Sequence, residues 1–153
     1  MPNHYVKGLA LTILLSMTHC TELRAQQGRG WGPKSPYNSL YDASTQVEVE
    51  GTIDEIQTKS PLMGMSIGIH LIQKTGSRRT EVHLGPSWYL QNQEPMLAKG
   101  DAIKVLGSKV QIDNRQVIIA RRITKGTQIL ELRDQSGRPY WAGWRRRHCC
   151  GPP

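Results

Sequence analysis

Apolar and polar residues alternate along several short stretches of the chain. At residues 46–53, 65–71 and 80–84, apolar or small residues occupy every second position. A period of two is typical of β-strands that bury one face, because successive side chains point to opposite sides. We therefore predict an all-β protein. Shorter apolar stretches predict its remaining strands, at residues 103–107, 110–112, 116–123 and 127–132.

The second and third stretches are joined by a segment that predicts a tight β-hairpin. Gly76-Ser77 suits a two-residue type II′ turn, because the first turn position needs a positive φ that glycine adopts without strain. In the register set by this turn, Leu71 faces Val82 and Ile69 faces Leu84. We expect these four apolar residues to be buried on one face, since a one-residue shift would separate them.

The residues that follow the hairpin predict a short helix. Pro86 suits a helix start, the Trp-Tyr-Leu run at 88–90 follows it, and Pro95 ends the helical stretch. A helix between the third and fourth strands of a small barrel is the arrangement of the OB-fold. We therefore predict an OB-fold-like barrel of five to six strands over residues 46–134, with a small β-sandwich as the alternative.

The composition restricts the class of protein. The chain has 153 residues, which is enough for one domain. Lys and Arg number 20 against 12 Asp and Glu, which gives a net charge of +8, and Phe is absent. These values exclude a multidomain enzyme, a multi-span membrane protein and a long coiled coil.

The N-terminus has the features of an export signal. Lys7 precedes ten mostly apolar residues, and a polar stretch then ends at Ala25. Ten residues are too few to cross a bilayer, which takes about 20. We predict a signal peptide over residues 1–25, a secreted or periplasmic protein, and no transmembrane span in the mature chain. A lipoprotein signal with a lipidated Cys20 is the weaker alternative, and a short buried helix is another.

Two further segments flank the predicted barrel. Residues 26–45 are rich in Gly, Pro and Ser and predict a linker or an arm that lies over the domain. Residues 135–153 form a basic, aromatic tail, for which packing of Trp141 on the barrel is the simplest interpretation. The tail could also contact an envelope protein or an anionic surface. Nucleic acid ranks last, because export removes the usual nucleic-acid partners. The candidate contact residues are Trp141, Trp144, Arg145, Arg146 and Arg147.

The opposite face of the hairpin carries the sharpest chemical feature of the sequence. In the predicted register His70 faces His83, and cross-strand Cβ atoms lie about 4.5–5.5 Å apart. Two imidazoles so placed could both bind one copper or zinc ion. Met65 falls on the other face, so the sequence identifies no third ligand. The alternative, which the missing third ligand favours, is two surface histidines that pack together or hydrogen-bond the helix segment, with no cofactor.

Other chemistry has weak support in the sequence. The adjacent Cys149 and Cys150 at the C-terminal end could pair with another chain in an oxidising compartment, or bind metal together with His148. The chain contains no GxSxG, HExxH, P-loop or CxxCH motif. We therefore predict a protein that is not an enzyme.

The chain resembles a family of small exported bacterial β-domains that includes the magnetosome MamS/MamX proteins. The segments VHLGPSWYL and LRDQSGRPYW carry the resemblance, together with the more general KGDAIKVLG, and it covers about residues 46–143. It implies an exported barrel and, in magnetosome members, a role in magnetite crystal maturation or redox balance. The redox members carry a CxxCH haem motif, which this sequence lacks.

Together these features predict an exported, non-enzymatic barrel with a binding or scaffolding role in the cell envelope, related to the magnetosome. The alternative function is a periplasmic copper- or zinc-binding protein that uses the cross-strand pair of His70 and His83.

Overall fold

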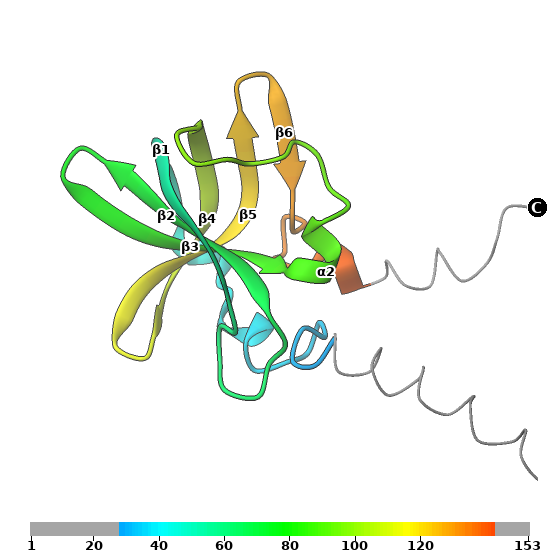
Figure 1. The fold of residues 1–153 in the computed structure, drawn as a ribbon. Coiled ribbons are helices and arrows are strands. Elements are labelled where there is room, and N and C mark those ends of the chain that lie inside the picture. The colour runs from blue at the N-terminus through cyan, green and yellow to red at the C-terminus, as the bar shows by residue number, and fades with distance from the viewer. Residues whose placement is uncertain (1–27, 143–153) are drawn as a thin grey trace, which may run out of the picture.

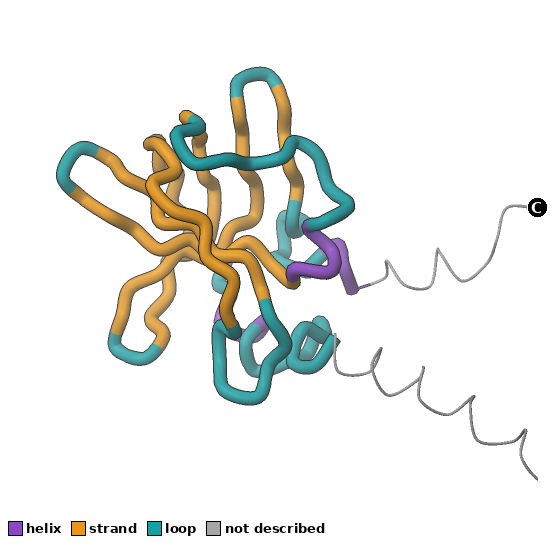
Figure 2. Tube along the Cα trace, in the orientation of Figure 1, coloured by secondary structure: helices purple, strands orange, loops and turns teal. Residues whose placement is uncertain are grey.

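Six strands form one curved sheet in the computed structural model, which describes residues 28–142 (Figure 1). The strands are β1 (Gln46–Lys59), β2 (Gly68–Thr75), β3 (Arg78–Pro86), β4 (Ala102–Ile112), β5 (Arg115–Lys125) and β6 (Gln128–Glu131). Helical segments are short (Figure 2). They are η1 (Asn38–Leu40), η2 (Ala43–Thr45), α2 (Ser87–Leu90) and η3 (Tyr140–Ala142).

The strand order closes the sheet into a barrel. β1 pairs with both β2 and β4, and β4 pairs with β5. β3 then pairs in parallel with β5, which closes β1 to β5 into a ring, while β6 extends the sheet beyond β5. A five-stranded closed barrel with a helix between β3 and β4 is the OB-fold arrangement, in which closure leaves few free strand edges. The predicted all-β OB-fold-like barrel is therefore confirmed.

The β2–β3 hairpin has the predicted turn. Gly76 has a φ of 59°, and Ser77 does not have a positive φ, as a type II′ turn requires. Leu71 pairs with Val82, and both side chains are fully buried. Leu84 is also buried in the same core. The alternation of the sequence thus identified the apolar face of this hairpin.

One predicted pair is wrong. A register shift between Ile69 and His70 makes Ile69 pair with Gly85 instead of Leu84. Ile69 is only half-buried, and it packs against the edge of the core. The irregularity lies where β2 begins, beyond the part of the hairpin whose register the turn fixes.

Strand boundaries differ from the prediction in three places. β1 continues to Lys59, six residues past its predicted end, with an irregularity between Ile53 and Glu55. β2 begins only at Gly68, so the alternating residues before it belong to a loop. The two strands predicted at 103–107 and 110–112 are one strand, β4, which continues through a register shift beside Gly107.

The segment that precedes β1 lies against the barrel. Trp31 and Tyr37 are buried, with ring centroids 5.1 Å apart. The backbone N–H of Asp42 donates to the Ser108 hydroxyl of β4 at 3.0 Å. From residue 28 onward the predicted arm therefore covers one face of the sheet and contributes side chains to its core.

A buried arginine ties this segment to the other end of the described chain. Arg133 donates to Asn38 Oδ1 at 2.8 Å and to the Gly137 carbonyl at 3.0 Å. Its guanidinium lies over the rings of Tyr41 and Trp141.

Within residues 28–142, no helix is long and apolar enough to cross a membrane.

Candidate functional site

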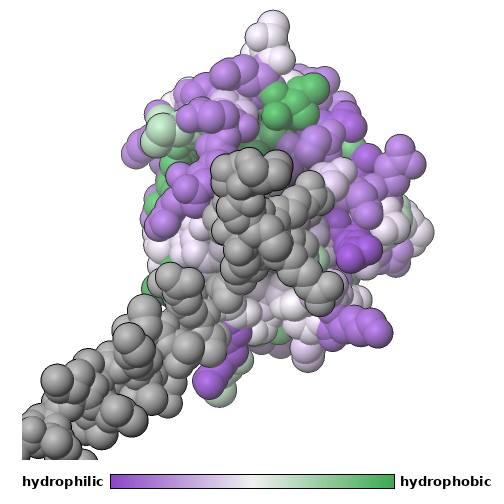
Figure 3. Space-filling model, turned by 90° about the vertical axis from the view of Figure 1, so that its right-hand side faces the viewer, coloured by the Kyte–Doolittle hydropathy of each residue, from purple (hydrophilic) through white to green (hydrophobic). Residues whose placement is uncertain are grey.

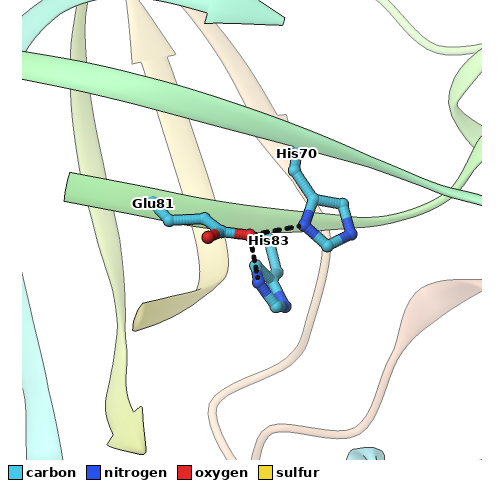
Figure 4. A group of neighbouring side chains, drawn as sticks. All are labelled: His70, Glu81 and His83. Carbon is cyan, nitrogen blue, oxygen red and sulfur yellow. Dashed lines mark hydrogen bonds and ion pairs between the residues drawn. The ribbon is translucent and has the colours of Figure 1, made fainter. Parts of the chain in front are cut away.

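The two candidate histidines lie side by side, and a carboxylate lies between them. His70 belongs to β2, whereas Glu81 and His83 belong to β3 (Figure 4). Glu81 Oε1 lies 3.0 Å from His70 Nδ1 and 3.1 Å from His83 Nε2. The imidazole centroids are 4.0 Å apart. The cross-strand register predicted from the hairpin turn therefore brings both rings to one carboxylate oxygen.

Both histidines are buried, which corrects the expectation of a surface pair. His70 is fully buried and His83 is 3% exposed. The Tyr37 ring stacks on His83, and its hydroxyl lies 3.2 Å from His83 Nδ1. The arm therefore covers the face of the hairpin that the alternation alone assigned to solvent.

Burial keeps both imidazoles neutral. It lowers the pKa of His70, and it lowers the pKa of His83 to about 3 with a further contribution from His70. Burial acts to raise the pKa of Glu81, but hydrogen bonds from Lys59 and His70 outweigh it and lower this pKa to about 2. The cluster thus contains one carboxylate and two uncharged rings.

The hydrogen bonds assign a role to each ring nitrogen. A carboxylate only accepts, so His70 Nδ1–H and His83 Nε2–H donate to Glu81. His83 Nδ1 is then free to accept from the Tyr37 hydroxyl. His70 Nε2 is buried and has no hydrogen-bond partner among the described residues, which is uncommon for a buried polar atom.

Two cations lie on the remaining side of the carboxylate. Lys59 Nζ is 2.8 Å from Glu81 Oε1, and Arg115 Nη1 is 3.5 Å from Oε2. Glu81 is 12% exposed, against 37% for Lys59 and 64% for Arg115. Beside them lies a small cavity of about 140 Å³, whose wall includes the cluster, both cations, Ser60 and Asp113. The cluster is therefore closed on the arm side and meets a cavity on the cation side.

The cluster has the composition of a metal site. One ligand atom from each of His70, Glu81 and His83 lies within 4.8 Å of the other two. Ligands of a tetrahedral zinc ion are about 3.3 Å apart at the usual bond lengths. Two histidines and one carboxylate hold catalytic zinc and non-haem iron(II) in other proteins. The arrangement can therefore offer three ligands and leave one position open.

The sequence analysis did not assign Glu81 to the site, although a signal was present. Glu81 lies two residues before His83 in the same strand, so both side chains point to one face. No signal of this kind pointed to Tyr37, because this residue lies in a segment without the period of a strand or a helix. Lys59 and Arg115 also come from distant positions that only the folded chain brings together.

Of the candidate contact residues of the tail, the structure describes Trp141. Trp141 is buried, which makes its assignment to a contact surface wrong and agrees with packing on the barrel. Its indole N–H donates to the Trp31 carbonyl at 3.0 Å. Trp144 and the arginines at 145–147 lie outside the described residues, as do Cys20, Cys149 and Cys150.

A second cavity, of about 450 Å³, has a different lining. Its wall is mainly apolar and includes Leu71, Leu84 and Leu130 of the barrel, together with residues 90–97. The side of the molecule that carries α2 is seen in Figure 3, where the surface is largely hydrophilic with small hydrophobic areas. The one metal-ligand cluster found within residues 28–142 does not line this cavity, where the titratable residue is Glu94.

Comparisons with known proteins give one informative match. No curated protein matches the chain. Among solved structures, one chain of the crystal structure of the S. pombe Stn1-ten1 complex is similar, with 14% identity and a TM-score of 0.40. The similarity covers 78% of this chain and 89% of that one. The model of the MamS/MamX magnetosome protein family matches residues 45–130, which include His70, Glu81 and His83. The chain therefore belongs to the MamS/MamX magnetosome protein family.

Proposed function

We propose that this protein is an exported, non-enzymatic binding protein of the cell envelope that serves the magnetosome by holding a transition-metal ion. The observation that carries the proposal is that His70, Glu81 and His83 each offer a ligand atom within 4.8 Å of the other two. The family match supports the link to the magnetosome. The cavity beside His70, Glu81 and His83 supports a binding role, which is also compatible with scaffolding.

The donor set favours zinc or iron(II). Both accept two imidazoles and a carboxylate, whereas copper(I) prefers sulfur ligands, which these three residues do not supply. Metal binding at His70 Nδ1 and His83 Nε2 requires each ring to carry its proton on the other nitrogen. The Tyr37 hydroxyl can rotate and accept from His83 Nδ1–H, as the second-shell partner of a ligating histidine does.

Zinc titration with thermal unfolding tests the metal site. A ligand that binds only the folded state stabilises it, by about 2.7 kcal/mol at a concentration of 100 Kd. We expect zinc to raise the melting temperature of the wild-type protein. Glu81→Gln, His70→Gln and His83→Gln should each remove this increase. The wild-type reference and all variants carry Cys20→Ser, Cys149→Ser and Cys150→Ser, so that thiols do not contribute.

Glu50→Gln is the matched control, because it removes the same charge from a carboxylate that, within residues 28–142, forms its ion pair with the exposed Lys104. It should retain the full zinc effect. Cobalt(II) absorption of the wild-type protein gives a readout that does not depend on variants folding. Equal zinc effects in Glu81→Gln and Glu50→Gln, with no cobalt spectrum, would overturn the proposal.

Export is tested separately, by mass spectrometry of the protein from its native cells. We expect a chain that starts close to Gln26, because the predicted signal ends at Ala25. A cytoplasmic protein with an intact Met1 would contradict an envelope function and restore nucleic acid as a candidate partner.

A further inference from the structure

We infer that this site binds its metal ion together with a small oxyanion, which Lys59 and Arg115 hold beside the metal. The inference rests on the proposed metal site and specifies its fourth ligand. An oxyanion here means a carboxylate, carbonate, sulfate or phosphate group that gives one oxygen to the metal and accepts hydrogen bonds from the two cations.

The first argument is the charge of the site. Glu81 is the only carboxylate among the three ligands, and Lys59 and Arg115 already pair with it. A divalent ion at Glu81 would displace the Lys59 ammonium from the oxygen it now shares with both histidines. A divalent ion and the two protein cations would then bring four positive charges, against two negative charges from Glu81 and from Asp113, which lines the same cavity. Such an excess of positive charge in a partly buried site is unfavourable unless an anion joins it.

The second argument is the position of the cations. Tyr37 covers His83 on the arm side of the cluster, whereas Lys59 and Arg115 stand on the side of the cavity. The three ligand residues line the same cavity as the ammonium and guanidinium groups, so a fourth ligand of the metal would enter from that cavity. Arginine in particular binds oxyanions through two parallel N–H groups.

The third argument is the available space. The cavity of about 140 Å³ is several times larger than the space that one water molecule needs. A small oxyanion of a few heavy atoms fits this volume beside a metal ion, but a nucleotide or a peptide does not. Ser60 in the same wall supplies a hydroxyl that can donate to an anion, although it now donates to the Met65 carbonyl at 2.8 Å.

The test measures zinc affinity in different anions at equal ionic strength. Perchlorate serves as the weakly coordinating anion, sulfate as a tetrahedral oxyanion and acetate as a carboxylate. We expect zinc to bind the wild-type protein about tenfold more tightly in at least one of the oxyanions than in perchlorate. Tenfold corresponds to about one charge-assisted hydrogen bond. A preference between sulfate and acetate identifies the class of oxyanion.

Lys59→Met and Arg115→Met should remove this dependence on the anion. Lys104→Met and Arg79→Met are the matched controls, because both side chains form exposed ion pairs on other parts of the barrel and should keep it. In perchlorate, Lys59→Met should bind zinc at least as tightly as the wild type, since the competing ammonium is gone.

The outcomes separate the two proposals. Zinc binding of equal strength in all three anions overturns the oxyanion and leaves the metal site standing. An anion dependence that persists unchanged in Lys59→Met and Arg115→Met also overturns it, because the anion would then bind elsewhere. Absence of zinc binding in every anion overturns both the metal site and the oxyanion.

Discussion

The two faces of the β2–β3 hairpin are both buried, but by opposite chemistry. Leu71 and Val82 form a pair on one face and belong to the apolar core of the barrel. His70 and His83, each one residue away, form the pair on the other face, beneath the arm. The apolar face needs only matching volume, whereas every polar atom of the other face needs a partner.

The two cavities beside the hairpin also differ in the polarity of their walls. The larger one touches Leu71 and Leu84 and offers apolar volume, whereas the smaller one touches His70 and Glu81 and offers ligands and charge. A single hairpin thus separates an apolar interior from a polar one by the alternation of its side chains. Changes on the two faces should therefore differ in size and in their dependence on pH.

The largest effect is expected on the apolar face. Leu71→Ala should lower the free energy of unfolding by about 2–5 kcal/mol, because the lost methyl groups leave a cavity in a packed core. Urea denaturation measures this change. Ile129→Ala is the control, since this side chain is exposed and its loss should cost less than about 1 kcal/mol. Equal losses for both variants would mean that the face assignment is wrong.

The polar face should make stability depend on pH. The unfolded chain has histidine pKa values of about 6.5, whereas burial lowers the pKa of His70 and brings that of His83 to about 3. Below pH 6.5 the unfolded state therefore binds more protons, and the free energy of unfolding falls as the pH falls towards 3. Each such proton contributes up to about 1.4 kcal/mol per pH unit.

Glu81 acts in the same direction at lower pH, since its pKa falls from 4.5 to about 2 on folding and its contribution is lost over that interval. Denaturation at a series of pH values between 7 and 4 should show the slope that the two histidines cause in the wild type. His83→Gln should have a shallower slope. A free energy of unfolding that stays constant from pH 7 to 4 would contradict neutral, buried histidines.

A smaller effect is expected where the arm meets the polar face. Tyr37→Phe keeps the ring but leaves His83 Nδ1 without its hydrogen bond, which should cost about 1–3 kcal/mol. In the double variant with His83→Gln, the two losses should not add, because the residues share one contact. Tyr140→Phe is the control, since its side chain is 48% exposed. Additive losses would show that Tyr37 acts only through its packing.

The smallest effect is expected at an exposed ion pair. Lys104 lies 2.7 Å from Glu50 on the outside of the barrel, and exposed ion pairs of this kind contribute little to stability. Lys104→Met should therefore leave the midpoint of urea denaturation nearly unchanged, and the change should be smaller still at high salt. A larger loss would mean that this ion pair contributes more to stability than its exposure implies.

Much of the barrel could be predicted from local patterns. Alternation identified the apolar face, and the Gly76-Ser77 turn set the register that pairs His70 with His83. These features depend on residues close in sequence, where the period of a strand and the φ of a turn leave few alternatives. The bulge beside Ile69 was missed, because the curvature of β2 depends on strands that are distant in sequence.

The sequence by itself determined that two histidines face each other, and only the tertiary structure decided what surrounds them. Alternation cannot reveal that an irregular arm covers the second face, and so the pair was assigned to the surface. Burial under Tyr37, convergence on Glu81 and the approach of Lys59 and Arg115 all depend on chain segments that meet only in the closed barrel. The physical reason is that the residue type decides which atoms can bind a metal. The burial of those atoms, the charges beside them and their pKa values depend on the residues that surround them in the folded chain.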